Sequence, residues 1–263
     1  MQIADKVFVV TGGGNGMGRQ VVLELARRGA RVAAVDVNED SLAETIGSAG
    51  DAAGSVTPHA VDVTDRSAVA ALPGQVDDAH GQVDGVVNIA GIIHRFTKFT
   101  DLSDDEIERI MNVNFWGTVN VCRAFLPVLL DRPAACLVNM SSLSALLPFA
   151  SQTFYGASKG AVKQFSEGLY AELLDTDVAV TTVFPGNIST NLTGNSGVAM
   201  IDAGGQKVRS TTPERAGSEI VEGIEKGSFR VVIGSDARVL DRLSRMSAKR
   251  ATRLVAKRMK SVL

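Results

Sequence analysis

The sequence predicts an α/β fold: a doubly wound parallel sheet of about seven strands, with helices on both faces. Two observations predict it. Short apolar runs alternate with longer helical stretches along most of the 263 residues, as in parallel sheets covered on both faces. The polar and glycine-rich motifs follow the ends of these runs, where ligands bind in such folds. We expect one large domain over residues 1–235 and a C-terminal extension over 236–263.

The elements follow one another in a regular order. The apolar runs expected as strands are 6–11, 31–36, 56–61, 83–88, 135–141, 178–184 and 230–233. The stretches expected as helices are 16–29, 39–48, 65–79, 103–130, 152–175 and 213–226. Right-handed crossovers between parallel strands would distribute these helices over the two faces of the sheet.

Composition argues against several classes of protein. Hydrophobic residues make up 45% of the chain and charged residues 21%, as in soluble globular proteins. No apolar run reaches about 18 residues and the N-terminus enters a strand almost at once, so we expect no membrane span, no signal peptide and a cytoplasmic protein. Cys122 and Cys136 lie in apolar surroundings and are expected to be buried, unreactive thiols. His59, His80 and His94 are scattered, so no metal site is expected.

A glycine-rich segment at residues 11–18, Thr-Gly-Gly-Gly-Asn-Gly-Met-Gly, joins the first expected strand to the first expected helix. Glycine lets the chain turn tightly at positive φ and lets backbone approach a ligand. The helix that follows offers free N–H groups and its positive dipole end to a pyrophosphate. The spacing G-x-x-x-G-x-G differs from the G-x-G-x-x-G dinucleotide fingerprint. We interpret the segment as a phosphate-binding turn; a turn without a ligand is the alternative.

Tyr155 and Lys159 are four residues apart in an expected helix, so their side chains share one face. An ammonium beside a phenol favours the phenolate and lowers a pKa that is otherwise about 10, which suits proton exchange with an alcohol. Ser142 ends an expected strand thirteen residues before Tyr155. Consecutive strand side chains point to opposite faces, so only one of Ser141 and Ser142 can face the site, and the spacing selects Ser142. Ser144 could also reach it. The alternative is an amphipathic helix with a surface lysine.

These motifs, together with others in a fixed order, resemble the short-chain dehydrogenase/reductase family over about residues 3–235. The others are Asp62-Val63 after the third strand, the segment 88–91, Asn114, and the segment 185–190. Segment 88–91 reads Asn-Ile-Ala-Gly where the family has Asn-Asn-Ala-Gly, and 185–190 matches Pro-Gly-x-x-x-Thr. The resemblance implies a Rossmann-like fold.

The resemblance also implies a role for each of four catalytic residues. Tyr155 would be the general acid/base, and Lys159 would lower its pKa and bind the nicotinamide ribose. Ser142 would polarise the substrate oxygen. Asn114 would hold a water molecule in a proton relay; alternatively, it is a helix-interior polar residue bonded to the backbone.

The cofactor is expected to be NAD. Asp36 ends the second strand 18 residues after Gly18, where a carboxylate can accept hydrogen bonds from ribose hydroxyls and repel a 2′-phosphate. Family members that use NADP commonly carry a basic residue where this chain has Asn15 or Val37. Arg19 is expected to face solvent. The alternative for Asp36 is a turn former.

The resemblance extends to the rest of the cofactor site. Asp62 and Val63 would flank the adenine, and Asn88, Ala90 and Gly91 would line the adenosine side. Alternatively or in addition, Asp62 caps the next helix and Asn88 is a strand-end turn residue. Ile188 and Thr190 would hold the carboxamide. The complete expected set is Gly12, Asn15, Gly16, Met17, Gly18, Asp36, Val37, Asp62, Val63, Asn88, Ala90, Gly91, Tyr155, Lys159, Pro185, Gly186, Ile188 and Thr190.

The substrate is expected to be a secondary, hydrophobic alcohol or its ketone. Apolar residues surround the expected site: Leu143, Leu146, Leu147, Pro148, Phe149, Phe154 and Phe184. Residues 191–212, rich in small polar residues, are expected to cover the substrate; a surface insertion is the alternative. His94 and Arg95 could rim the pocket and hold an anionic tail, or face solvent. The competing functions are a 3-oxoacyl-type carbonyl reductase of lipid metabolism and a non-catalytic NAD-sensing protein.

The C-terminal extension, 236–263, is strongly basic, with nine Lys and Arg against two Asp. We expect one or two helices, either packed with a solvated basic face or lying on an anionic membrane surface or an acidic partner subunit. It lacks the aromatic residues typical of nucleic-acid binding, which is not expected. The resemblance implies a homodimer or homotetramer through helices 103–130 and 152–175.

Overall fold

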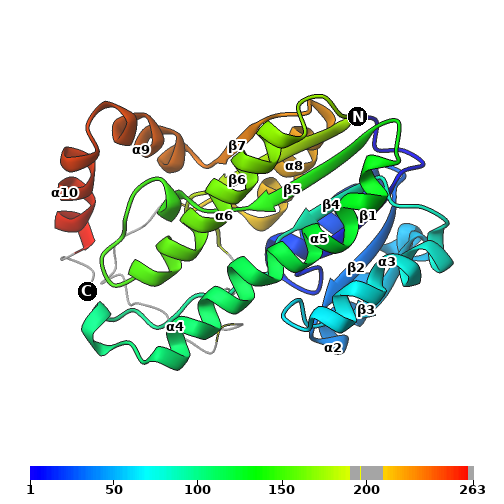
Figure 1. Cartoon of the computed structure of the whole chain (residues 1–263), viewed down its shortest axis with the longest axis horizontal. Coiled ribbons are helices and arrows are strands. Elements are labelled where there is room, and N and C mark those ends of the chain that lie inside the picture. Colours follow the sequence, from blue (N-terminus) through cyan, green and yellow to red (C-terminus); the bar gives the residue numbers. More distant parts are fainter. Residues whose placement is uncertain (190–195, 197–209, 260–263) are drawn as a thin grey trace.

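A computed structural model describes residues 1–189, 196 and 210–259 of the chain. Their strands form one parallel sheet in the order β3-β2-β1-β4-β5-β6-β7 (Figure 1). The strands are β1 (Val7–Thr11), β2 (Arg31–Asp36), β3 (Val56–Ala60), β4 (Gly85–Asn88), β5 (Ala135–Met140), β6 (Val178–Pro185) and β7 (Arg230–Ile233). The predicted fold class is confirmed. The strand order changes direction between β1 and β4, which is where doubly wound sheets bind ligands.

The expected helices are present, and one of them contains a π-helical turn. They are α1 (Gly16–Arg27), α2 (Glu39–Ser48), α3 (Arg66–His80), α4 (Asp104–Met111), α5 (Gly117–Leu130), α6 (Thr153–Glu172) and α8 (Pro213–Glu225), with short 3₁₀ turns at Gly50–Ser55, Phe99–Asp101 and Leu143–Ala145. The helix predicted over 103–130 is present as one continuous helical stretch, Asp104–Leu130. A π-helical segment, η3 (Asn112–Trp116), separates α4 from α5. Such segments are rare and are frequent at functional sites.

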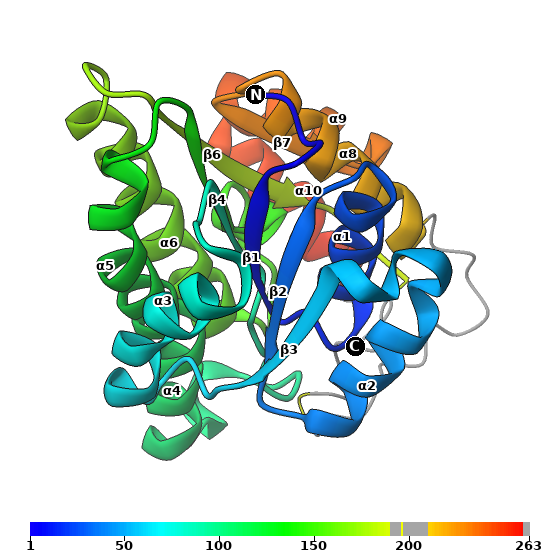
Figure 2. The ribbon, with the colours of Figure 1, turned by 90° about the vertical axis from the view of Figure 1, so that its right-hand side faces the viewer.

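The helices form two layers on either side of the sheet, as Figure 2 shows end-on. Helices α1, α2 and α8 cover one face, and α3, α5 and α6 cover the other. Strand side chains alternate between the layers, so Phe8 and Val10 pack in the first core and Val7 and Val9 in the second. This double burial explains why the strands read as continuous apolar runs.

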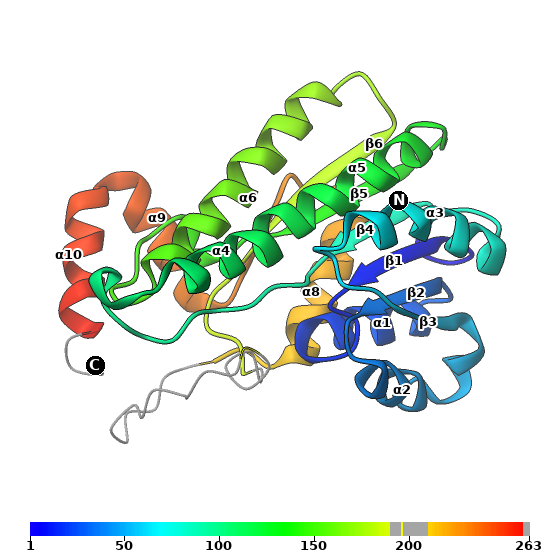
Figure 3. The same cartoon turned by 60° about the horizontal axis from the view of Figure 1, so that its bottom comes forward.

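The C-terminal extension forms two helices, α9 (Ser235–Met246) and α10 (Ala248–Met259). They lie beyond the first turns of α6, at the same end of the molecule as the loop after β5 (Figures 1 and 3). Ala251 and Val255 of α10 are buried against Leu147, with Phe149 and Leu240 packed beside them. The apolar side of α10 is therefore used within the fold.

The stretch Asp104–Leu130, which comprises α4, η3 and α5, is long and apolar enough to cross a membrane, judged by length and composition alone. In the fold, its side chains Val121, Phe125 and Leu129 are buried in the second core. A buried core helix meets the same criterion. The expected absence of a membrane span therefore stays a prediction.

Candidate active site

The glycine-rich turn after β1 is packed directly against the loop after β4. Gly12 has φ +68°, and a Cβ atom there would lie 2.9 Å from the main-chain nitrogen of Ala90. The hydroxyl of Thr11 accepts hydrogen bonds from the N–H groups of Ile89 (3.1 Å) and Ala90 (3.3 Å). Asn15 caps α1, its side chain accepting from Gly16 N–H at 2.7 Å. The turn and the N-terminus of α1, with Met17 and Gly18, thus sit at the β1–β4 switch point.

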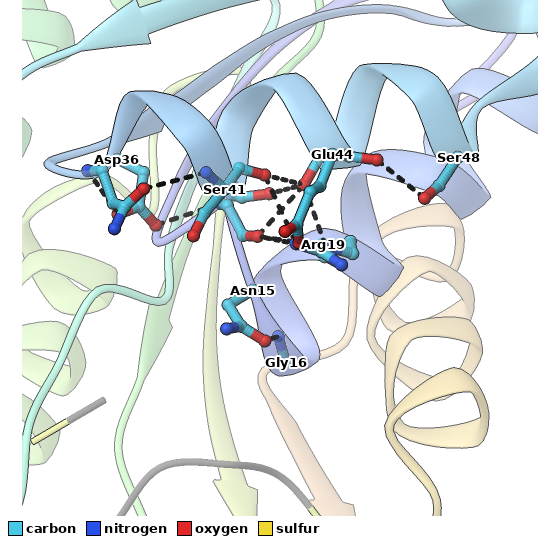
Figure 4. A network of polar contacts seen from close by, with 11 residues as sticks. Asn15, Gly16, Arg19, Asp36, Ser41, Glu44 and Ser48 are labelled. Carbon is cyan, nitrogen blue, oxygen red and sulfur yellow. Dashed lines mark hydrogen bonds and ion pairs between the residues drawn. The ribbon is translucent and has the colours of Figure 1, made fainter. Parts of the chain in front are cut away.

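Asp36 closes this turn from the end of β2 (Figure 4). Its carboxylate accepts hydrogen bonds from the N–H of Gly14 (3.0 Å) and of Asn38 (3.1 Å). The turn-former interpretation is therefore correct as a structural role, and it holds the carboxylate beside the glycine turn. Val37 next to it is 72% exposed.

Arg19 does not face solvent, so that prediction is wrong. Its guanidinium donates to the carbonyl of Gly14 (2.6 Å) and to Thr45 Oγ1 (3.0 Å). It also forms an ion pair with Glu44 at 2.8 Å (Figure 4). The main chain of the glycine turn is unshielded by side chains, so a guanidinium with several donors can satisfy its carbonyls. Arg19 therefore clamps the turn to α2 and has its charge offset by Glu44.

Asp62 and Val63 follow β3. Asp62 is exposed, and its carboxylate accepts from the N–H and hydroxyl of Thr64, both at 2.8 Å. The alternative that Asp62 caps the next helix is wrong, because Asp65 caps α3 with hydrogen bonds from Ser67 and Ala68. Val63 is buried.

Asn88, at the end of β4, belongs to a buried polar network rather than to a surface turn. Its amide donates to Asn139 Oδ1 (2.9 Å) and to Cys122 Sγ (3.4 Å), and Asn139 donates to Ser166 (3.0 Å). Burial raises the pKa of the Cys122 thiol to about 12, and that of Cys136 likewise. Both thiols are therefore protonated and buried, as expected.

Tyr155, Ser142, Lys159 and Asn114 are brought together at the carboxyl edge of the sheet. Tyr155 is half-buried in the first turn of α6 and shares a hydrogen bond with Ser142, which follows β5. Ser142 also accepts from Ser144 N–H at 3.1 Å. The hydroxyl of Ser141 donates instead to the carbonyl of Lys159 (2.8 Å), so the two serines do point apart.

Asn114 lies in the π-helical segment and is fully buried. Its amide donates to the carbonyl of Ile92 (2.9 Å) and to Ser158 Oγ (3.0 Å), and its Oδ1 accepts from Ile92 N–H (2.8 Å). This is the backbone-bonded arrangement given as the alternative. Asn114 therefore fixes the loop after β4 onto α6, next to Lys159.

Gly91 lies between these polar groups. A Cβ atom at this position would be 3.1 Å from Lys159 Nζ and 3.1 Å from Asn114 Oδ1. Lys159 itself is 3% exposed and donates to the carbonyl of Met140 at 3.0 Å. Lys159 Nζ and Asn114 Oδ1 therefore pack directly against Gly91, where a side chain would crowd both groups.

The pKa values of the two groups correct one expectation. Burial raises the pKa of Tyr155, and the hydrogen bond with Ser142 only partly opposes this. Burial lowers the pKa of Lys159 to about 8. The predicted lowering of the Tyr155 pKa by Lys159 is therefore wrong for this structure, because Lys159 is directed at Met140 and burial disfavours the phenolate.

The segment after β6 is held by an acidic residue that sequence reasoning missed. Pro185 ends β6, and Gly186 N–H donates to Ile233 O at 2.9 Å. Asn187 N–H donates to Asp236 Oδ2 at 3.1 Å. Ile188 is half-buried beside Thr211. Asp236 belongs to the basic extension, and nothing in the sequence signals this contact. Thr190 and most of 191–212 lie outside the described residues.

Some of the apolar residues expected around the substrate site belong to the buried core, and others do not. Leu143, Leu147 and Phe184 are buried, and Phe154 stacks on Phe99 with centroids 5.8 Å apart. Arg95 is bound to Glu106 (2.8 Å) at the surface, whereas His94 is buried. Arg95 is therefore already paired, and its expected role at the pocket rim gains no support.

Comparison with known proteins gives consistent matches. A family model described as short chain dehydrogenase matches residues 6–200. A putative oxidoreductase, SadH, of Mycobacterium tuberculosis is 38% identical over 261 residues, which cover 95% of this chain and 94% of that protein.

Solved structures match over nearly the whole chain. A short chain dehydrogenase/reductase from Burkholderia phymatum in complex with NAD has a TM-score of 0.84 at 25% identity and covers 95% of this chain and 96% of its own. A short chain dehydrogenase from Burkholderia cenocepacia in complex with NADP has a TM-score of 0.81 at 26% identity, covering 97% and 99%.

Proposed function

Because this chain belongs to the short-chain dehydrogenase/reductase family and is an oxidoreductase, we propose that it interconverts a secondary, hydrophobic alcohol and its ketone with NAD. The observation that carries the proposal is the cluster around Gly91. Lys159 Nζ and Asn114 Oδ1 pack directly against Gly91, and Tyr155 and Ser142 lie at the same carboxyl edge of the sheet. A hydroxyl acid/base, a hydroxyl donor and an ammonium are the groups that alcohol oxidation needs.

The residues fit a dinucleotide. The turn at 11–18 and the N-terminus of α1 lie at the β1–β4 switch point, where main-chain N–H groups can bind a pyrophosphate. The dinucleotide would be held by this turn, by Asp36, and by Lys159 on its ribose. When bound, the nicotinamide accepts or supplies a hydride at the substrate carbon.

The protein's own part is to move one proton and to stabilise charge. During oxidation, the Tyr155 oxygen takes the proton of the substrate hydroxyl; during reduction it returns the proton. The Ser142 hydroxyl donates to the substrate oxygen, where charge develops. Asn114 acts here as a positioning residue that fixes the loop at Ile92 against α6.

The preference for NAD rests on charge around the glycine turn. Asp36 places a carboxylate beside Gly14, and Val37 is apolar. The nearby cation, Arg19, is held by Glu44 and by carbonyl groups. A 2′-phosphate would therefore meet a carboxylate and an arginine that is already paired.

We further propose a cytoplasmic homodimer or homotetramer. Large apolar side chains are exposed on or near α5 and α6, namely Trp116, Leu130, Tyr170, Leu174 and Phe229. Exposed apolar groups on these helices fit the expected pairing of α5 and α6 with a second copy. Light scattering after size-exclusion chromatography would measure the oligomeric state, and a monomer at micromolar concentration would contradict it.

The test of the proposed function is reduced-nicotinamide absorbance during incubation with secondary alcohols, hydroxysteroids and hydroxyacyl compounds, with NAD and NADP in parallel. Turnover with NAD, lost in Tyr155→Phe, is the expected result. The same panel as ketones, with reduced cofactor, tests the carbonyl-reductase alternative. Absence of turnover in both directions, with NAD binding intact by calorimetry, would instead support a non-catalytic NAD-binding protein.

A further inference from the structure

Two buried polar residues lie in contact beside the catalytic cluster. His94, in the loop after β4, is 4% exposed, and Gln152, just before α6, is 5% exposed. Gln152 Nε2 donates to the carbonyl of His94 at 2.9 Å. A second contact, from Thr97 N–H to the carbonyl of Ser151 (3.3 Å), joins the same two segments. The pair is therefore fixed by main-chain contacts.

Both residues present a free hydrogen-bond acceptor. His94 Nδ1 lies 2.7 Å from the carbonyl of Arg95, which can only accept, so Nδ1 carries the proton and Nε2 of the neutral ring is an acceptor. Gln152 uses its amide nitrogen on a carbonyl, which leaves Oε1 as an acceptor. Neither His94 Nε2 nor Gln152 Oε1 has a hydrogen-bond partner among the described residues, and both atoms are buried. Buried polar atoms without a partner are uncommon and destabilising.

The pair lies on the two segments that adjoin the catalytic residues. Gln152 precedes Tyr155 by three residues, and its carbonyl accepts from Gly156 N–H at 2.9 Å. His94 is two residues beyond Ile92, which Asn114 holds. Gln152 N–H in turn donates to the carbonyl of Phe149, which packs near Leu147 and α10. Main-chain contacts thus link Gln152 both to the helix that carries Tyr155 and to the apolar cluster at Leu147.

We propose that His94 Nε2 and Gln152 Oε1 form a substrate subsite that binds a second hydroxyl group, carried on the apolar part of the alcohol or ketone. This inference rests on the proposed function. It narrows the substrate from any hydrophobic secondary alcohol to one bearing a hydrogen-bond donor some distance from the reacting carbon. A few placed polar groups within an apolar lining are how such pockets select ligands.

A neutral donor fits this subsite better than an anion. A carboxylate would need His94 to be protonated, and it would still face the oxygen of Gln152. The nearby cation, Arg95, is bound to Glu106 and to the carbonyl of Asp101. A hydroxyl can donate to either acceptor without any change of charge.

The experiment compares kcat/KM with NAD for a linear secondary alkanol and for diols of the same chain, with the second hydroxyl moved along the chain one carbon at a time. The wild-type enzyme should prefer one or two of the diols by at least about tenfold, because a site built for a hydroxyl rejects the analogue lacking it. His94→Phe and Gln152→Leu should each bring this diol-to-alkanol ratio close to one. Gln164→Leu, on the exposed side of α6, is the matched control and should keep the wild-type ratio.

The outcomes separate the two proposals. Equal kcat/KM for the alkanol and every diol in the wild-type enzyme would overturn the subsite alone and would mean that the acceptors bind trapped water only. A diol preference that persists in both variants would also overturn it. If the wild-type enzyme binds NAD but oxidises no alcohol in the series, the proposed function fails and the subsite fails with it. His94→Phe keeps the carbonyl to which Gln152 donates, so at least one variant should retain the local fold.

Discussion

Buried charged groups are fully paired at the edge of the sheet where the strands begin, and they are not at the edge where the strands end. At the amino edge, Asp84 is fully buried just before β4, and each of its oxygens has partners. It accepts from Val7 N–H (3.0 Å) and Gln82 (2.8 Å), and it pairs with Arg132 (2.9 Å) and Lys6 (3.4 Å). Burial alone would raise the pKa of Asp84, but these hydrogen bonds and charges outweigh it and lower the pKa. This edge is built for stability.

At the carboxyl edge, buried groups are left in states that burial disfavours. Lys159 is buried without a carboxylate partner in the described structure, and its pKa falls to about 8. Acceptor atoms on Asn88, His94 and Gln152 have no partner there either. Unfavourable buried groups of this kind persist when the surrounding structure imposes them, and they cluster at functional sites. The comparison indicates that this edge is arranged for ligands rather than for stability.

The largest effect should come from Tyr155→Phe, which removes the proton carrier and leaves the ring. We expect kcat/KM for alcohol oxidation to fall by about 10³-fold or more, with NAD affinity by calorimetry nearly unchanged. Because the pKa of Tyr155 is raised, oxidation by the wild-type enzyme should speed up as pH rises above neutral, and reduction should slow. Substantial activity in the variant would show that the carboxyl edge works by another group.

Asp84→Asn should weaken the amino edge strongly. It leaves Arg132 and Lys6 without their buried carboxylate, so we expect the free energy of unfolding to fall by about 2–4 kcal/mol, measured by urea denaturation. Asp78→Asn, at an exposed position on α3, is the control.

The same variant tests the pH dependence. The folded-state pKa of Asp84 lies below its unfolded value of about 3.9, so its contribution is present above about pH 4 and is lost as pH falls through the folded pKa. Asp84→Asn should lack this part of the acid destabilisation. An equal acid slope in both proteins would contradict the assignment.

Lys159→Met, at the carboxyl edge, should change the free energy of unfolding in the opposite direction from Asp84→Asn. Activity should be lost, but the free energy of unfolding near neutral pH should rise by about 1–3 kcal/mol, because the variant no longer buries a charged amine. The folded pKa, about 8, is below the ordinary 10.5. The folded state therefore binds fewer protons between these values, and the wild type should gain stability as pH rises through them. A lower free energy of unfolding in the variant would contradict the claim that the buried Lys159 ammonium destabilises the fold.

The smallest effects concern cofactor choice. Asp36→Ala should reduce the ratio of kcat/KM for NAD over NADP by about tenfold, since it removes a carboxylate facing a 2′-phosphate. Glu44→Gln should shift the ratio the same way by a few fold, because it frees Arg19 from its ion pair. Asp40→Ala, exposed on α2, controls for general charge. Ratios that match the control would refute the role of Asp36 in cofactor choice.

Local patterns were sufficient to predict much of this protein. The strand–turn–helix at 11–18, the Tyr155–Lys159 spacing, and the opposite directions of Ser141 and Ser142 follow from periodicities that hold within a few residues. The order of apolar runs then implies a doubly wound sheet, because parallel strands require crossovers of one hand. The same order places the glycine turn and the catalytic residues at the carboxyl edge of the sheet.

Contacts between distant segments were decided by the tertiary structure alone. The clamp of Arg19 on the glycine turn, the contact of Asp236 with Asn187, and the packing of α10 on Leu147 each join residues whose partner the sequence does not name. The π-helical turn at Asn114 arises where its amide meets the main chain of Ile92, 22 residues away. Burial likewise set the pKa directions of Tyr155 and Lys159. A sequence specifies local geometry, but the dielectric surroundings and hydrogen-bond partners of a side chain exist only once the chain is packed.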